Sequence, residues 1–233
     1  MADPVTVAYV HSHEVAYSWH SSMMAAFGHD LSASQRIVRG GTIAVKYGTG
    51  GIVQARNSAV GRFLQSDTPW LFWIDTDMGF APDTIDRLAA GADPDERPIV
   101  GGLAFAQREV EADGYGGFRT EPTPTLYDWH TRTDGVAGFA PRFDYLPDEL
   151  QPVSGTGSAC LLIHRTVFEK VADLAGPCWY DPVRNPTDGR WLGEDLSFCV
   201  RAIEAGLSIW VDTSVRTTHL KNVWLGGDDV QPA

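Results

Sequence analysis

The sequence predicts an α/β fold in which helices flank a mostly parallel central sheet. The first reason is the order of the patterns, because short apolar runs alternate with helical segments from residue 5 to residue 105, as in βαβ units. The second is the run Trp-Leu-Phe-Trp-Ile at 70–74, since five bulky apolar residues in a row are typical of a strand buried on both faces. The third is that this run ends at Asp75 and Asp77, and ligands of open α/β sheets bind beyond the carboxyl ends of strands.

Composition narrows the class of protein. The chain has 233 residues, 43% of them hydrophobic, enough for one large domain or two small ones. Its net charge is −12, so the chain lacks the overall positive field that is typical of a nucleic-acid binder. The three cysteines are odd in number and show no C-x-x-C spacing, so neither a disulfide framework nor a zinc site is indicated. We expect a cytoplasmic protein, because the sequence shows no signal peptide and no apolar run that approaches a membrane span.

The first half of the chain supplies the alternating elements. Apolar runs with β-branched or aromatic residues predict strands at 5–10, 35–39, 70–74 and 98–105. Helical spacing predicts helices at 15–27, 52–64 and 82–90. Glycines bracket residues 43–47, which we expect to form an irregular connection.

The second half changes character. Residues 106–150 are rich in Gly, Pro, Thr and Asp with interleaved aromatics, which predicts long loops or an antiparallel edge, with a strand at 123–129. Further on we expect strands at 159–163, 207–211 and 215–219, helices at 166–174 and from Leu196 to Gly206, and a loop at 178–190. No repeat or second domain boundary is visible, so we expect a single domain over 1–225 and a disordered tail at 226–233.

Two acidic motifs each have a functional and a structural interpretation. Asp75 and Asp77 flank Thr76 and offer hard oxygen ligands for Mg²⁺ or Mn²⁺ carrying a diphosphate, or they form an Asx-turn at a strand end. Glu194 and Asp195 open a helix. They supply a general base for a hydroxyl nucleophile, or they complement the helix dipole.

The remaining polar motifs are weaker. Gly155-Thr156-Gly157 lacks a full G-x-G-x-x-G and precedes a strand, which argues against a dinucleotide fingerprint and leaves close backbone approach to a ligand or a tight turn. His219 and His11 are ligands or ordinary satisfied histidines. Arg56 and Asn57 bind a phosphate or base, or they form part of a polar helix face.

Taken in order, these segments resemble the GT-A glycosyltransferases, particularly family 2-like members. The likeness covers residues 5–222, and its strength is in the order of the pieces. The segments that carry it are 55–57, 72–78, 100–103, 124–127, 155–157, 163–168, 193–199 with Arg201, and 211–219. Of these, 72–78 is similar to the family's aspartate-x-aspartate motif, and 193–199 is similar to its acidic helix start.

The resemblance implies a GT-A fold with a small antiparallel or loop-rich acceptor-side region, and metal-dependent transfer of a sugar from a nucleotide-diphosphate sugar to an acceptor hydroxyl. It implies that Mn²⁺ or Mg²⁺ is held by Asp75, Asp77 and His219, and that Asp195, beside Glu194, is the base of an inverting reaction. The residues it implies for the nucleotide-sugar are His11, Ser12, Arg56, Asn57, Asp75, Thr76, Gly155, Thr156, Gly157 and Trp191.

The sequence leaves open the nucleotide base, the stereochemistry and the acceptor. Residues 39–42 lack the acid with which family 2 members often read uracil, so the donor is a UDP- or a GDP-sugar. A histidine ligand is also common in retaining enzymes, so the stereochemistry is open. The acceptor is a saccharide, a protein, a small molecule or a modified nucleic-acid base. The alternatives are a nucleotidyltransferase, which would normally carry a glycine-rich basic loop in place of residues 11–14, and a non-catalytic nucleotide- or carbohydrate-binding module.

Overall fold

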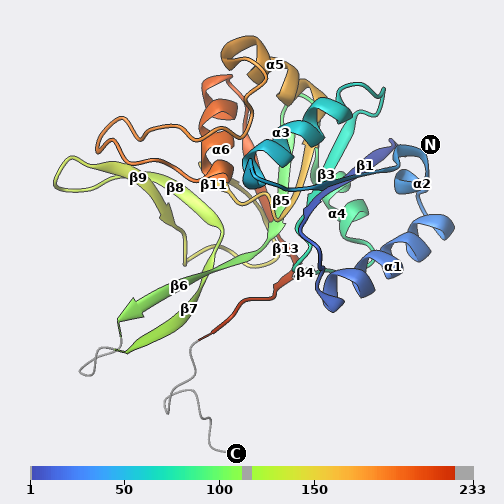
Figure 1. Cartoon of the computed structure of the whole chain (residues 1–233), viewed down its shortest axis with the longest axis horizontal. Coiled ribbons are helices and arrows are strands. Elements are labelled where there is room, and N and C mark those ends of the chain that lie inside the picture. The colour runs from blue at the N-terminus through green and yellow to red at the C-terminus, as the bar shows by residue number, and fades with distance from the viewer. Residues whose placement is uncertain (1, 112–116, 224–233) are drawn as a thin grey trace, which may run out of the picture.

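A seven-stranded central sheet organises the chain (Figure 1). The computed structural model describes residues 2–111 and 117–223, so the tail expected at 226–233 lies outside the described residues. The strands of the sheet are β1 (Val5–His11), β2 (Thr42–Lys46), β3 (Trp70–Ile74), β5 (Ile99–Leu103), β10 (Leu150–Val153), β12 (Cys160–His164) and β13 (Ile209–Arg216). Their spatial order is β10-β13-β5-β12-β3-β1-β2. Five strands run in one direction, and only β10 and β12 pair antiparallel with their neighbours.

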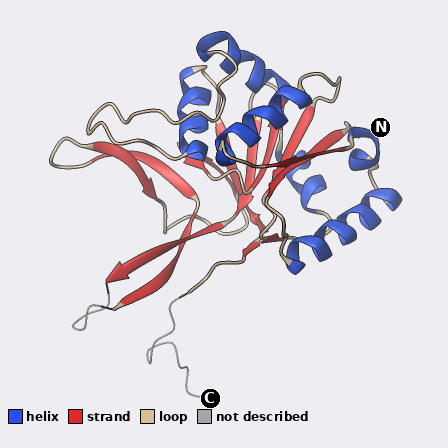
Figure 2. Ribbon diagram, in the orientation of Figure 1, coloured by secondary structure: helices blue, strands red, loops and turns tan. Residues whose placement is uncertain are grey.

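Helices cover both faces of this sheet (Figure 2). They are α1 (Tyr17–Ser32), α2 (Arg36–Gly40), α3 (Gly51–Phe63), α4 (Thr84–Gly91), α5 (Arg165–Ala175) and α6 (Glu194–Glu204). On one face α3, α5 and α6 bury Phe63, Phe168 and Phe198 in one core cluster, and on the other α1 and α4 bury Trp19 and Leu88 in a second. The expected α/β class with a mostly parallel sheet is therefore confirmed. None of the helices described here is long and apolar enough to cross a membrane.

β3 lies at the centre of both clusters. All five of its residues are buried, and they alternate between the faces: Leu71 and Trp73 belong to the α3 side, whereas Trp70, Phe72 and Ile74 belong to the α1 side. Burying each such side chain stabilises the fold by about 1.5–3 kcal/mol. The expectation of a strand buried on both faces is confirmed, and it places the acidic pair at the end of a rigid element.

Antiparallel pieces make up the region expected as long loops or an antiparallel edge. β6 (Phe105–Glu111) and β7 (Phe118–Pro124) form a ribbon that projects from the sheet in Figure 1. β8 (Leu126–Thr131), β9 (Ala137–Pro141) and β11 (Gly155–Thr156) form a small sheet. The prediction of a single strand at 123–129 is therefore wrong, because these residues are divided between the end of β7 and the start of β8, with Thr125 between them. The Thr125 N–H donates to the Ala104 carbonyl at 3.0 Å at this position.

The second strand lies later in the chain than the sequence predicts. Residues 36–39 of the expected strand belong to helix α2, and strand β2 covers residues 43–46 of the stretch expected to be irregular. Asp30 is the reason: its carboxylate oxygens accept the Ile37 N–H (3.1 Å) and the Val38 N–H (2.9 Å). These are the amide groups that the start of a helix leaves unpaired. A short apolar run does not distinguish strand from helix. Here the deciding cap is a carboxylate seven and eight residues before the amides that it accepts from.

The C-terminal strands also differ from expectation. The two strands expected at 207–211 and 215–219 are one continuous strand, β13, followed by the short β14 (Thr218–His219). β14 leaves the central sheet and pairs antiparallel with β4 (Met78–Gly79). This change of partner determines where His219 lies.

The Asp30 cap supports a stability prediction. Asp30→Ala should lower the free energy of unfolding by about 1–3 kcal/mol, because it leaves two amide groups of α2 unpaired at a buried position. Asp30 is 3% exposed, and urea unfolding measures the loss. Asp173→Ala, at an exposed site on α5, is the matched control and should change stability by less than about 0.5 kcal/mol. Equal effects of the two substitutions would contradict the capping role.

Candidate functional site

The acidic loop follows β3 directly, and hydrogen bonds hold it on both sides. The Asp75 N–H donates to the Ala159 carbonyl (3.1 Å), and the Met78 N–H donates to the Asp75 carbonyl (3.1 Å). Residues 75–78 thus form a tight turn between β3 and β4. Because β4 pairs with β14, with Met78 opposite His219, the far end of the described chain lies beside this turn.

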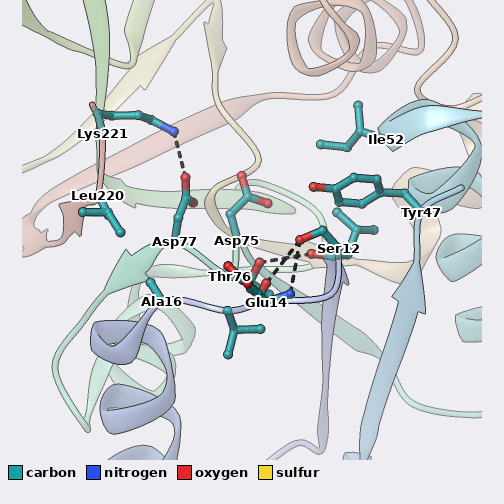
Figure 3. A pocket seen from close by; sticks show the side chains of 12 residues that line it. Ser12, Glu14, Ala16, Tyr47, Ile52, Asp75, Thr76, Asp77, Leu220 and Lys221 are labelled. Atoms are coloured by element: carbon teal, nitrogen blue, oxygen red, sulfur yellow. Dashed lines mark hydrogen bonds and ion pairs between the residues drawn. The ribbon is translucent and has the colours of Figure 1, made fainter. Parts of the chain in front are cut away.

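Two cationic or potentially cationic groups converge on one oxygen of Asp77. His219 Nε2 lies 3.0 Å from Asp77 Oδ2, and Lys221 Nζ lies 2.8 Å from the same atom, as Figure 3 shows for the lysine. His219 Nδ1 lies 2.7 Å from the Phe105 carbonyl, so Nδ1 carries a proton and donates it there. Burial on its own raises the pKa of Asp77, but the hydrogen bonds from His219 and Lys221 outweigh burial and hold that pKa at about 2.

A buried arginine lies beneath the loop and links it to α6. Arg56 comes from α3, and its side chain is 1% exposed. Its Nη2 lies 3.0 Å from Asp75 Oδ1 and 3.7 Å from Asp195 Oδ1. Its guanidinium carbon lies 5.1 Å from the Trp73 ring centroid and 5.5 Å from that of Tyr180, so aromatic faces add to the stabilisation of the charge.

Charge and burial oppose each other in this cluster. Burial lowers the pKa of Arg56, but the charges of Asp75 and Asp195 outweigh it, so its pKa lies above the ordinary value. Burial raises the pKa of Asp75, and the Arg56 guanidinium offsets only part of that rise. Burial also raises the pKa of Glu194, and the neighbouring Asp195 charge adds to the rise. Clusters of perturbed carboxylates of this kind are found preferentially at functional sites.

Two cavities meet at Asp75. The first, which we call the Asp77 cavity, has a volume of about 430 Å³ (Figure 3). Its walls are Val10, Ser12, Glu14, Val15, Ala16, Tyr47, Ile52, Asp75, Thr76, Asp77, Leu220 and Lys221. The second, the Asp195 cavity, has a volume of about 250 Å³, and its polar walls include Asp75, Thr125, Tyr127, Thr156, Glu194, Asp195 and His219. The Asp77–His219 ion pair therefore joins a residue of one cavity to a residue of the other.

Most of the residues implied by the resemblance are brought together here. Ser12, Asp75, Thr76 and Asp77 line the first cavity. Thr156, Gly157, Glu194, Asp195 and His219 line the second. A Cβ at position 157 would lie 3.7 Å from Asp195 Oδ2, so a side chain there would crowd this carboxylate oxygen.

Three residues expected on the nucleotide side lie elsewhere. Arg56 lies beneath both cavities and lines neither. Asn57 fixes the loop after α5, where its amide donates to Asp181 (2.7 Å) and its carbonyl accepts from the Tyr180 N–H (2.9 Å). His11 ends β1, with Nδ1 2.8 Å from the Ser12 carbonyl, and is not among the residues of the Asp77 cavity. These three side chains make contacts within the fold, and their contact with a nucleotide stays a prediction.

Two further residues are also set apart. A Cβ on Gly155 would lie 2.8 Å from the Phe139 ring, so the lack of a side chain at this position permits β11 to pack against that ring. Trp191 is 62% exposed and carries the Arg184 guanidinium 4.5 Å from its ring centroid. It lines a separate cavity of about 320 Å³ with Leu196, which also lines the Asp195 cavity.

Sequence reasoning missed eight residues of the Asp77 cavity, among them the charged Glu14 and Lys221 and the larger side chains of Tyr47 and Ile52. Tyr47 follows β2, and the glycines on both sides of this strand led to the prediction of an irregular connection. A signal for Lys221 was present, because residues two apart in an extended chain point to the same side. A histidine at 219 on this edge therefore predicts that residue 221 faces the same loop.

No family model and no curated protein sequence matches this chain. Among solved structures, A197 from STIV superposes with a TM-score of 0.54 at 14% identity, over 94% of this chain and 86% of that chain. GalNAc-T7, solved with UDP, GalNAc and Mn²⁺, superposes with a TM-score of 0.58 at 13% identity, over 98% of this chain. The chain has a GT-A-like fold. It spans 45% of the GalNAc-T7 chain, and at these identities the likeness extends to the fold alone.

The GT-A-like fold raises the question whether these residues fit a divalent ion. Nowhere in the described residues do three or more His, Cys, Asp or Glu side chains form a group that could hold a metal. Asp77 and His219 nevertheless form a compatible pair, because the Phe105 carbonyl fixes Nδ1–H and turns Nε2 toward the carboxylate. Such a backbone partner is what orients a ligating histidine, and an oxygen with an imidazole nitrogen suits Mn²⁺. Two protein ligands fit, whereas Asp75 is paired with Arg56.

The Arg56 cluster supports a second prediction. Arg56→Leu should lower the free energy of unfolding by about 3 kcal/mol, because it leaves two partly buried carboxylates without their cation. The value lies at the lower end for buried pairs because the Asp75 and Asp195 side chains keep 22% and 29% exposure. Arg62→Leu, at an exposed position of the same helix, is the control for urea unfolding and should cost less than about 0.5 kcal/mol. A comparable loss in both variants would refute the bridging role.

Proposed function

We propose that this protein is a metal-dependent glycosyltransferase that transfers a sugar from a nucleotide-diphosphate sugar to an acceptor hydroxyl. The observation that carries the proposal is the shared wall at Asp75, with Asp77 in one cavity and Asp195 in the other. A transfer reaction requires a donor pocket and an acceptor pocket that meet where one bond breaks and another forms. The two cavities that meet at Asp75 support this proposal.

The Asp77 cavity is the proposed donor pocket. Tyr47 and Ile52 offer an aromatic ring and an apolar side chain to a nucleobase, and base–aromatic stacking contributes about 1–3 kcal/mol per base. Asp77 and His219 would hold Mn²⁺ or Mg²⁺ at the diphosphate. When bound, the ion neutralises charge that develops on the leaving nucleoside diphosphate. The donor is a UDP- or GDP-sugar, and the UDP in the GalNAc-T7 structure supports the nucleoside diphosphate class.

The Asp195 cavity is the proposed acceptor pocket. Asp195 accepts the proton of the acceptor hydroxyl while the hydroxyl oxygen bonds to the anomeric carbon, and the bond from that carbon to the diphosphate oxygen breaks. The charge of Arg56, with Nη2 3.7 Å from Asp195 Oδ1, attracts this carboxylate. Glu194 lines the same cavity, and burial raises its pKa. This role for Asp195 describes an inverting transfer, and the acceptor is a saccharide, protein, small molecule or modified nucleic-acid base.

The alternatives predict other chemistry. A nucleotidyltransferase needs cations at the loop after β1 to meet a triphosphate, whereas that loop places Glu14 in the Asp77 cavity. A non-catalytic binding module would bind a nucleotide-sugar without cleaving it. Release of nucleoside diphosphate from UDP- or GDP-sugars in the presence of Mn²⁺ and acceptor hydroxyls separates the enzyme from both alternatives.

The donor pocket predicts that binding depends on a metal. UDP or GDP should bind at least tenfold more tightly with Mn²⁺ than with EDTA, because the carboxylates of the Asp77 cavity repel a diphosphate unless a cation intervenes. Isothermal titration calorimetry measures both affinities. His219→Ala should remove most of the Mn²⁺ effect while the melting temperature in EDTA changes little. Equal affinity with and without metal would eliminate the metal-dependent proposal.

The acceptor pocket predicts the effect of losing the base. Asp195→Asn should lower kcat about 10²–10⁴-fold, the usual contribution of general-base catalysis, while donor affinity stays nearly unchanged. Glu194→Gln, one residue away in the same cavity, is the matched control and should reduce kcat much less. If Asp195 only caps α6, asparagine should replace it well, and wild-type turnover in Asp195→Asn would assign it that structural role.

A further inference from the structure

The strongest unassigned feature of the site is the lysine on Asp77. Lys221 Nζ lies 2.8 Å from Asp77 Oδ2, the same oxygen that lies 3.0 Å from His219 Nε2. A divalent ion held by Asp77 and His219 requires that oxygen. The ammonium and the ion are therefore placed to compete for one ligand atom.

The surroundings of Lys221 distinguish it from an ordinary surface ion pair. Among the described residues that line the Asp77 cavity it is the sole cation, and it shares the cavity with three carboxylates, those of Glu14, Asp75 and Asp77. Its side chain is 34% exposed. Figure 3 shows it reaching toward Asp77 from the segment that also carries Leu220. A diphosphate in this cavity would find no other cationic side chain on the described walls.

Backbone hydrogen bonds hold the residues just before Lys221, while its long side chain can rotate. The Leu220 N–H donates to the Asp77 carbonyl at 2.9 Å, one residue before the lysine, and β14 holds the preceding two residues on β4. A lysine side chain is a compact charge on a flexible four-carbon stem. It can therefore change its anionic partner within the cavity without movement of the backbone.

We propose that Lys221 is a displaceable internal cation that pairs with Asp77 until a divalent ion takes the Oδ2 atom, and that it then pairs with the diphosphate of the bound nucleotide. This inference rests on the proposed function, since the ion and the diphosphate are its ligands. It makes the two ligands cooperative. The diphosphate gives Lys221 a new partner and so favours metal binding, and by thermodynamic reciprocity the metal favours the diphosphate by the same factor.

The first test uses Mn²⁺ alone, without nucleotide. Lys221→Ala should bind Mn²⁺ about two- to fivefold more tightly than the wild type in isothermal titration calorimetry, because the competing ion pair and the repelling charge are gone. Lys221→Arg keeps the charge and should retain most of the competition. Lys170→Ala, an exposed lysine on α5, should bind Mn²⁺ as the wild type does.

The second test uses inorganic pyrophosphate at saturating Mn²⁺, which isolates the diphosphate from base and sugar. Lys221→Ala should bind pyrophosphate about five- to tenfold more weakly, because a charge-assisted hydrogen bond is lost, and Lys170→Ala should not. One substitution thus shifts two affinities in opposite directions. Damage to the fold would weaken both.

The outcomes separate this inference from the proposed function. Tighter Mn²⁺ binding together with weaker pyrophosphate binding in Lys221→Ala supports the displaceable cation. Unchanged Mn²⁺ affinity in Lys221→Ala, with Mn²⁺ binding still lost in His219→Ala, overturns the role of Lys221 and leaves the proposed metal site intact. A wild-type protein that binds no Mn²⁺, with or without pyrophosphate, overturns the metal-dependent function and the inference with it.

Discussion

The buried charge of Arg56 is the interaction on which the candidate site depends. Two carboxylates from different elements, Asp75 after β3 and Asp195 at the start of α6, approach the same Nη2 atom. Without that cation, mutual repulsion and partial burial would drive the two carboxylates apart, and the two cavities would no longer meet. The aromatic faces of Trp73 and Tyr180 hold the guanidinium, so the hydrophobic core determines the geometry of the polar site. Arg56 thus links the proposed donor and acceptor sides without lining either cavity.

Sheet topology explains why residues far apart in the sequence converge here. β3 and β12 are central neighbours, and the turn after β3 is tied to the residue before β12 by the Asp75–Ala159 hydrogen bond. The ribbon of β6 and β7 contributes the Phe105 carbonyl that orients His219. Elements outside the central sheet therefore place the side chains, while the sheet fixes the edge at which they meet. This division agrees with the general rule that loops on a rigid scaffold carry function.

The fold class and the acidic strand could be predicted from sequence because burial on both faces leaves a local pattern, as in residues 70–74. The second strand could not, because a single carboxylate, Asp30, stabilises α2 from outside the segment. Local apolar pattern carries no trace of such a cap. In the site, Ser12, Thr76 and the acidic residues line the two cavities, whereas Arg56, Asn57, Gly155 and Trp191 make contacts within the fold. A motif specifies residue types but not the neighbour that each side chain contacts. The contacts of these residues within the fold could therefore not be predicted from sequence.

The pairing of β14 with β4 completes the candidate site late in synthesis and is also easily opened. Asp77 and Lys221 are 144 residues apart, so this contact is the last part of the site that synthesis supplies. It also closes a very long loop through a ladder of only two residues on each strand. A ladder so short opens more readily than the buried sheet beneath it. Opening it withdraws His219 and Lys221 together and leaves both hydrophobic clusters in place. Heat or denaturant can therefore abolish the site before it unfolds the domain, and amide exchange in β14 reports that earlier event.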